Sequence, residues 1–324
     1  MNKLELKNRE LETHVFSAGR ILEDANLLQF YTGFQSKSMF MACFNFLKSS
    51  ASSMHTWQGG RTNVDYDRRG AKRGPPMKMD LLDQFLFTCA RLRCGYPLED
   101  FADRFKVSTT TLSRIFTTWI NLMFVKFREL QVLPYRHKVD VNMPSCFKSM
   151  CPSTRIVIDC TEFYMQRPSS LESQSASFSA YKNTNTCKLL VGISPDGAIT
   201  FLSDLYEGSI SDRDLVIASG ILDKLERGDS VMADKGFEID DLLVPLGVRL
   251  NIPPFLDKRQ QMLPGDVRST KSIAAVRIHV ERAIGRLKEF KLLNGVIDNS
   301  LYDIFELIVF VAAMLCNFFP SLVA

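Results

Sequence analysis

The stretch RIVIDCTEFYM, residues 155–165, decides the fold of the second half of the chain. Its nearly continuous run of branched and aromatic residues predicts a strand that is covered on both faces. Asp159 lies near the centre of this strand. A carboxylate removed from water is unfavourable unless a cation, a metal ion or several hydrogen-bond donors compensate its charge. We therefore expect a compensating partner for Asp159.

The sequence that follows residue 150 predicts further strands and helices that alternate. A Pro195-Asp196-Gly197 turn joins two of the strands. A loop at about 254–271, rich in Pro, Gly, Lys and Arg, precedes a long helix. The expected strands are 186–194, 198–208, 229–237 and 248–255, and the expected helices are 211–225 and 272–291. The order βββαβαβα predicts an α/β domain in which helices pack on a mixed sheet.

Two more carboxylates occupy conspicuous places in this pattern. Asp234 follows the fourth strand at its carboxyl end, where functional sites collect in α/β sheets. On the last long helix each residue turns by about 100°, so that Arg277, Glu281 and Lys288 share one polar face. A neighbouring apolar stripe is expected to hold this helix against the sheet, which allows Glu281 to be aimed at Asp159. The stripe consists of Val276, Val280, Ala283, Leu287 and Phe290.

Three carboxylates in one place repel one another, and each is driven towards protonation unless a positive charge lies between them. Mg²⁺ and Mn²⁺ prefer carboxylate oxygens, and two such ions roughly 4 Å apart suit phosphodiester chemistry. The pattern therefore predicts a metal site formed by Asp159, Asp234 and Glu281. Taken singly, each of these residues is better explained by a structural role. Asp212 is more readily a helix-start residue, and Glu162 is expected on the other face of its strand.

The region before residue 150 has a helical pattern. Residues 80–126 predict three helices with tight connections, and Ser108 is a natural N-cap for the third helix. The pattern AxxFxVSxxTLSRxFxxW, from Ala102 to Trp119, resembles a helix-turn-helix, in which the later helix lies in the major groove of DNA. An ordinary helical bundle that does not touch DNA explains the same pattern. The exposed candidates for DNA contact are Thr109, Thr110, Ser113 and Arg114.

These patterns divide the 324-residue chain into four parts. The expected parts are an N-terminal helical segment (1–57), a basic linker (58–78), a helix-turn-helix region (79–145) and an α/β domain (150–319). The linker carries six Lys and Arg residues against two Asp, and it is either a solvated connection or a nucleic-acid or nuclear-import segment. The apolar run at 304–319 contains Glu306 and is expected to be a buried helix and not a membrane span.

Several short motifs carry a resemblance to a known family. They are IDCTE, the GxxSD of residues 208–212, ADKGF, IPPF and RIHVERAIGRLK. Together they resemble the DDE superfamily endonucleases, specifically the Harbinger-type transposases of animal genomes. The resemblance implies a ribonuclease H-like fold over about 150–319, and the helix-turn-helix before it is similar to the flank of these proteins.

The resemblance also implies roles for particular residues. Asp159, Asp234 and Glu281 correspond to the catalytic, metal-binding acids, and the implied cofactor is two Mg²⁺ or Mn²⁺ ions. Arg277 and Lys288 correspond to basic residues that contact the DNA backbone near the cut. The sequence departs from the family in two ways. Ala274 replaces a Tyr that often precedes the Arg by three residues, and the chain contains no C-x-x-C pair of the kind found in the zinc-binding module of many relatives.

The expected function is that of a nuclear transposase that hydrolyses phosphodiesters at transposon ends and joins the 3′-hydroxyls to target DNA. By analogy with transposition, which needs two DNA ends in one complex, we expect a homo-oligomer, and we expect no membrane partner. Two alternatives remain open at this point. One is a domesticated, catalytically idle DNA-binding protein, and the other is a ribonuclease H-like enzyme that processes RNA.

Overall fold

The fold is described from a computed structural model that defines residues 16–57, 79–130, 133–252 and 264–323, with only the backbone of 264–274. The expected basic linker lies outside these residues. The chain forms two compact units. A helical unit comprises Met1–Arg128 with Phe290–Leu292, and a sheet unit comprises Glu129–Glu289 with Leu293–Ala324.

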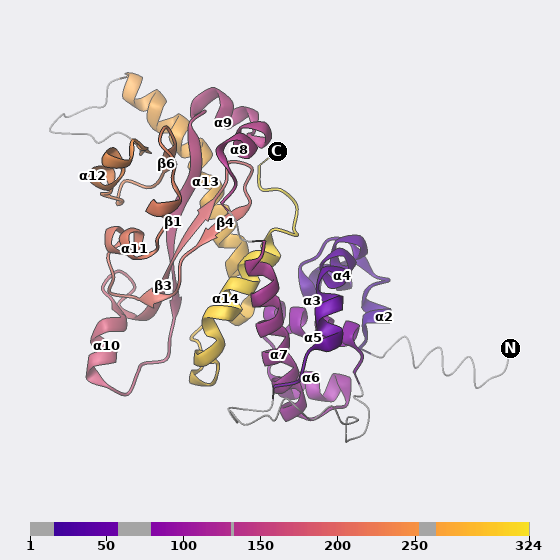
Figure 1. The fold of residues 1–324 in the computed structure, drawn as a ribbon. Coiled ribbons are helices and arrows are strands. Elements are labelled where there is room, and N and C mark those ends of the chain that lie inside the picture. The colour runs from indigo at the N-terminus through magenta and orange to yellow at the C-terminus, as the bar shows by residue number, and fades with distance from the viewer. Residues whose placement is uncertain (1–15, 58–78, 131–132, 253–263, 324) are drawn as a thin grey trace, which may run out of the picture. The chain divides into compact units, whose positions relative to one another are not determined.

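The helical unit is built from six described helices (Figure 1). Its core is aromatic, because the rings of Phe40 and Phe85 lie 4.9 Å apart and those of Phe85 and Trp119 lie 5.5 Å apart. The indole Nε1 of Trp119 donates a hydrogen bond to Gln84 Oε1 at 3.0 Å, which satisfies the one polar group of this large buried side chain. The helices are α2 (Ala18–Ile21), α3 (Ala25–Thr32), α4 (Lys37–Ser53), α5 (Leu81–Cys94), α6 (Leu98–Phe105) and α7 (Thr109–Arg128).

Helices α5, α6 and α7 are the three helices that the sequence predicts. Lys106 adopts a left-handed backbone conformation, with φ 52°, and this ends α6. The hydroxyl of Ser108 accepts a hydrogen bond from the backbone N–H of Thr111 at 3.2 Å, as expected of an N-cap. The tight turn between α6 and α7 is therefore fixed by local backbone chemistry, and the all-α class of this region is confirmed.

The sheet unit contains a seven-stranded mixed sheet. Along the sheet the order is β2-β3-β1-β6-β7, and β4 and β5 also pair with β3. Strand β1 is antiparallel to β3 and parallel to β6, so the predicted α/β class with a mixed sheet is confirmed. The arrangement is consistent with a ribonuclease H-like domain. The strands are β1 (Thr154–Tyr164), β2 (Phe178–Ser179), β3 (Thr184–Ile193), β4 (Ile199–Leu202), β5 (Tyr206–Glu207), β6 (Ser230–Met232) and β7 (Arg249–Asn251).

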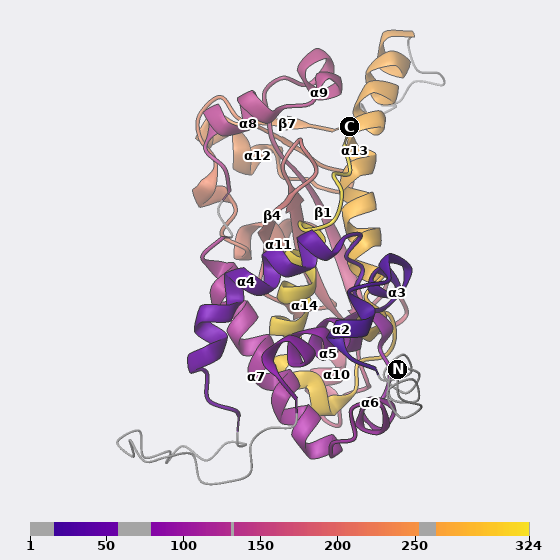
Figure 2. The same cartoon turned by 90° about the vertical axis from the view of Figure 1, so that its right-hand side faces the viewer.

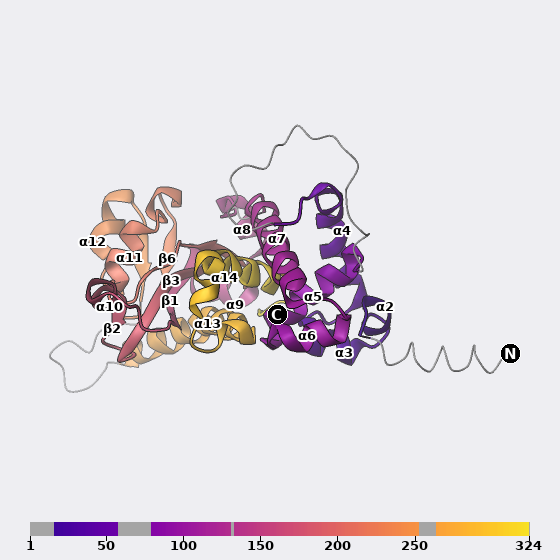
Figure 3. The same cartoon turned by 90° about the horizontal axis from the view of Figure 1, so that it is seen from below.

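Helices cover both faces of this sheet (Figure 3). Alternate residues of β1 point to opposite faces. Ile156 and Ile158 join a core that includes Leu215 of α11, whereas Phe163 packs on the other face against Phe305 of α14, with ring centroids 5.8 Å apart. The described helices of this unit are α8 (Arg136–Asn142), α9 (Ser145–Met150), α10 (Leu171–Ser177), α11 (Asp212–Ala218), α12 (Asp240–Leu243), α13 (Pro264–Lys288) and α14 (Tyr302–Cys316).

Helix α13 lies alongside β1 (Figure 2) and begins earlier than expected. The sequence predicts a loop to about residue 271, but the helix already begins at Pro264. A proline is tolerated in the first turn of a helix, where its missing N–H is not needed, so the Pro and Gly of this segment are compatible with a helix start. The predicted apolar stripe is buried throughout, but Phe290 belongs to the helical unit, where the guanidinium of Arg93 lies 5.8 Å from its ring centroid.

Helix α14 accounts for the apolar run near the C-terminus. Residues 299–316 are the one segment of the described chain that is long and apolar enough to cross a membrane. The side chains from Ile308 to Cys316 are all buried, and α14 packs against α13 and β4. This burial is what the core helix of a globular domain shows.

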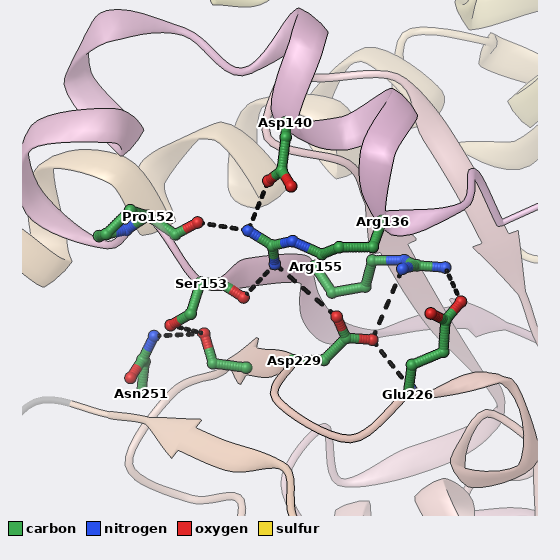
Figure 4. Close-up of polar contacts among 9 residues, drawn as sticks. Arg136, Asp140, Pro152, Ser153, Arg155, Glu226, Asp229 and Asn251 are labelled. Atoms are coloured by element: carbon green, nitrogen blue, oxygen red, sulfur yellow. Dashed lines mark hydrogen bonds and ion pairs between the residues drawn. The ribbon is translucent and has the colours of Figure 1, made fainter.

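A network of polar contacts joins the starts of β1 and β6 (Figure 4). Arg155 of β1 is 2% exposed and Asp229, next to β6, is 1% exposed, and their nearest charged atoms lie 3.6 Å apart. Arg136 of α8 approaches Asp229 at 3.7 Å and donates a hydrogen bond to the carbonyl of Ser153 at 2.6 Å. These contacts fix α8 and the two parallel strands to one another at their amino ends.

Candidate functional site

The strand register brings Asp159 and Asp234 to the same place. Val157 of β1 is directly opposite Met232 of β6, and these are the last paired residues of the two parallel strands. Asp159 and Asp234 each lie two residues further on, so strand alternation turns both side chains to the same face of the sheet. Strand β6 ends here, so the two carboxylates occupy its carboxyl end.

Two side chains of α13 complete the group. Arg277 and Glu281 are one helical turn apart, and Arg277 Nη2 lies 2.7 Å from Glu281 Oε1. The same guanidinium reaches Asp234, with Nη1 at 3.9 Å from Oδ2. Arg277 therefore links the helix carboxylate to the strand carboxylate. We call Asp159, Asp234, Arg277 and Glu281 the carboxylate cluster.

The surroundings of Asp159 raise the pKa of its carboxyl group to about 6. Burial is the main cause, and the charges of Glu281 and Asp234 act in the same direction. A hydrogen bond from the backbone N–H of Cys160, at 2.9 Å, and the charge of Arg277 oppose the shift. The three acids are thus close enough to disfavour one another's ionised forms, and Arg277 compensates them only in part.

Lys288 lies near the cluster, about two turns beyond Glu281 on α13. Burial and the neighbouring charge of Lys182 lower the pKa of its ammonium group, whereas Glu162 and Asp159 raise it. Lys288 is half-buried. The polar face predicted for α13 therefore lies where the sequence places it, beside Asp159.

The other face of β1 carries a second polar group. Lys188 Nζ lies 2.6 Å from Asp212 Oδ1, and Glu162 accepts a hydrogen bond from the hydroxyl of Thr186 at 2.8 Å. Glu162 is thus engaged on the face away from Asp159, as expected. Sequence reasoning missed Lys188, because only the antiparallel register, which sets Lys188 opposite Glu162, reveals its position.

The acids of the cluster fit a divalent metal by chemistry, because all are carboxylates and hard cations prefer such oxygen donors. The repulsion felt by Asp159 is the kind that a cation relieves. Within the described residues, however, no three His, Cys, Asp or Glu side chains lie close enough to hold a metal ion as they stand. In this arrangement Glu281 is paired with Arg277, with Arg277 Nη2 at 2.7 Å from Glu281 Oε1.

The four candidates for DNA contact all lie in the first two turns of α7. Thr110, Ser113 and Arg114 are exposed and Thr109 is partly exposed. The opposite face of the helix, with Leu112, Ile115 and Phe116, is buried in the helical unit. The side chains are thus free to meet a ligand, and their role in binding DNA stays a prediction.

Comparison with known proteins agrees with this geometry. Residues 158–317 match the family described as DDE superfamily endonuclease, and residues 77–129 match the family described as helix-turn-helix of DDE superfamily endonuclease. No curated protein and no solved structure matches the chain significantly. The chain therefore carries a domain of the DDE superfamily endonucleases with their helix-turn-helix before it. All four residues of the carboxylate cluster, and Lys288, fall within the endonuclease match.

Proposed function

We propose that this protein is a metal-dependent DNA transposase of the Harbinger type, which cuts phosphodiesters at transposon ends and joins the freed 3′-hydroxyls to target DNA. The observation that carries the proposal is the convergence of three carboxylates from β1, the end of β6 and α13. Membership of the DDE superfamily supports it, because these endonucleases generally use divalent metal ions.

In this mechanism Asp159, Asp234 and Glu281 would hold the two ions. Two Mg²⁺ or Mn²⁺ ions supply activation of the attacking oxygen and stabilisation of the leaving oxygen. Arg277 turns from Glu281 to the DNA backbone, which frees the carboxylate. Lys288 neutralises a phosphate beside the cut. Positioning and electrostatics provide the rate enhancement.

The helical unit supplies recognition of DNA in this proposal. Thr109, Thr110, Ser113 and Arg114 face the bases from the start of α7. Two DNA ends must meet in one complex, so the protein acts as a homo-oligomer, and its substrate places it in the nucleus.

Strand cleavage tests the proposal. Purified protein is incubated with labelled DNA in Mg²⁺, and we expect Asp159→Asn to cut at least about 100-fold more slowly than the wild type, because the loss of one charge-stabilising group has an effect of this size. The matched control is Asp223→Asn, which removes an exposed carboxylate that is not part of the carboxylate cluster. Equal cleavage by wild type and Asp159→Asn would reject the assignment.

A second candidate is a DNA-binding protein derived from a transposase that no longer cuts. The 2.7 Å pairing of Arg277 with Glu281 favours it, because a site that never binds metal has reason to keep its acid paired. Calorimetric titration with Mn²⁺ separates the two. Heat of binding that disappears in Asp159→Asn supports the enzyme, and the absence of binding by the wild type supports the idle protein.

A further inference from the structure

An exposed aromatic and basic surface lies at the turn between β2 and β3. We call residues 178–183 the hairpin tip. Tyr181 is 85% exposed and Phe178 is 43% exposed. A large ring that stands almost wholly in water contributes little to folding, and its face is open to a ligand.

The hairpin tip is a built turn. Phe178 and Ser179 pair with Asn185 and Thr184, and the backbone N–H of Lys182 donates a hydrogen bond to the hydroxyl of Ser179 at 3.2 Å. Asn183 adopts the left-handed conformation, with φ 53°, that closes the turn. The ring of Tyr181 is thus carried on an ordered support.

Two lysines give this surface its charge. Lys182 Nζ lies 4.6 Å from the ring centroid of Tyr181, and the charge of Lys182 also acts on Lys288 of α13. Within the described part of the chain, neither lysine forms a salt bridge with a carboxylate. Two neighbouring ammonium groups repel each other, and an anion that binds between them relieves the repulsion.

The hairpin tip is also continuous with the carboxylate cluster. The charges of Asp159 and of Lys182 both act on the ammonium group of Lys288. In addition, Phe178 is opposite Asn185 and Asp159 is opposite Val191, so strand alternation places Phe178 and Asp159 on the same face of the sheet. The hairpin tip and the carboxylate cluster are therefore on the same face of the sheet.

We propose that the hairpin tip binds an unpaired segment of a DNA strand beside the cut: the ring of Tyr181 stacks on a base, and Lys182 and Lys288 bind the phosphates. An unpaired segment fits better than an intact duplex, because a ring stacks only on a base whose face is free of its neighbours. This inference rests on the proposed function and adds to it the form of DNA that the site takes.

Binding to two DNA probes tests the inference in EDTA, where metal-dependent cutting stops. One probe is a labelled duplex with a single-stranded overhang, and the other is the same duplex with blunt ends. By fluorescence anisotropy at low salt, we expect Tyr181→Ala to weaken binding of the overhang probe by about 5- to 100-fold. Tyr181→Phe keeps the ring and should stay within about twofold of the wild type. The blunt probe should change little in either variant.

Lys182→Gln supplies a second measurement that does not depend on the ring. For the overhang probe, the slope of the logarithm of affinity against the logarithm of salt concentration should fall in magnitude by about one.

The matched control for Tyr181→Ala is Tyr302→Ala, which removes an exposed tyrosine at the start of α14. Because both tyrosines are exposed, both variants should keep the melting temperature of the wild type.

Two results would overturn the inference. In the first, Tyr181→Ala binds the overhang probe as tightly as Tyr302→Ala does. In the second, Tyr181→Ala changes the oligomeric mass measured by sedimentation, and binding of the overhang probe is not selectively lost. The hairpin tip would then be a contact between copies of the chain. Cleavage in Mg²⁺ is assayed separately. A chain that never cuts DNA, yet loses overhang binding with Tyr181→Ala, would refute the nuclease and keep this inference.

Discussion

The stretch over which the parallel strands β1 and β6 pair has a charged group at each end, and the balance of charge differs between the two groups. At the amino ends, Arg155 and Asp229 are buried and of opposite sign, and Arg136 adds to them (Figure 4). At the carboxyl ends, three acids share the single guanidinium of Arg277. The first group has its charges nearly balanced inside the protein. The second leaves excess negative charge at a place that solvent and ligands can reach.

This difference separates a structural group from a functional one on physical grounds. A buried pair with satisfied charge fixes the register of the strands, and nothing is gained by opening it. A cluster of like charges destabilises the folded state, and such a cluster persists where binding of a cation uses it. The contrast predicts opposite responses to the removal of one carboxylate from each group.

The largest effect is expected for Asp229→Asn. The substitution leaves the charge of Arg155, which is 2% exposed, without its buried partner, and Arg155 Nε and Nη1 already lack hydrogen bonds. We expect the free energy of unfolding to fall by about 3–5 kcal/mol, as for other broken buried pairs. Urea denaturation measures it. Asp223→Asn, which removes an exposed carboxylate, should change stability by less than about 0.5 kcal/mol. A loss for Asp229→Asn no larger than that of this control would contradict the structural role.

A gain in stability is expected for Asp159→Asn in EDTA. The pKa of Asp159 is about 6 in the folded protein and about 3.9 in an unfolded chain. The folded state thus binds the proton more tightly, so wild-type stability falls as pH rises from about 4 to 6. Asparagine cannot ionise and removes this penalty. At pH 7 we expect the variant to be more stable than the wild type by about 1–3 kcal/mol, and at pH 4 the two should be nearly equal.

Denaturation at a series of pH values checks the sign of this effect. Added Mg²⁺ should stabilise the wild type and leave Asp159→Asn unchanged, because a ligand stabilises only the form that binds it. Glu172→Gln, on the exposed first turn of α10, is the control and should show no such crossover. If the wild type is more stable than Asp159→Asn at every pH in EDTA, Asp159 is a structural residue like Asp229.

The sequence was sufficient for those parts of the site that depend on local periodicity. Asp159 could be placed in a covered strand because its neighbours are apolar, and Glu281 could be placed beside an apolar stripe because helical spacing is regular. Ser108 could be placed at the start of α7 because capping involves only adjacent residues. These features need no knowledge of which strand pairs with which.

Other parts depend on contacts between distant segments, and the sequence could not reveal them. The register of β1 with β6 decides that Asp159 and Asp234 share a face. The link from Arg277 to Asp234 depends on where α13 lies on the sheet, and from the sequence Arg277 was expected only at the DNA backbone. The early start of α13 was missed because Pro and Gly within a helix start resemble a loop.

The smallest effect is expected for Arg277→Gln, which removes the shared cation of the carboxylate cluster. Its partners Asp234 and Glu281 are each about half exposed, so water screens the loss, and stability in EDTA should fall by about 0.5–1 kcal/mol at pH 7. Because Arg277 lowers the pKa of Asp159, the substitution should also move the pH dependence of stability towards higher pH. Mg²⁺ should restore most of the lost stability.

Arg282→Gln is the matched control, since Arg282 is an exposed arginine on the same helix. It should change neither the stability in EDTA at pH 7 nor the part of the pH dependence that comes from Asp159. A loss for Arg277→Gln as large as that for Asp229→Asn would remove the contrast between the two charged groups. Arg277 would then be a fixed structural partner of the acids. Its charge would already compensate them, and a metal ion would have no excess negative charge to neutralise. A small loss that Mg²⁺ reverses means that the guanidinium holds the place of an exchangeable cation.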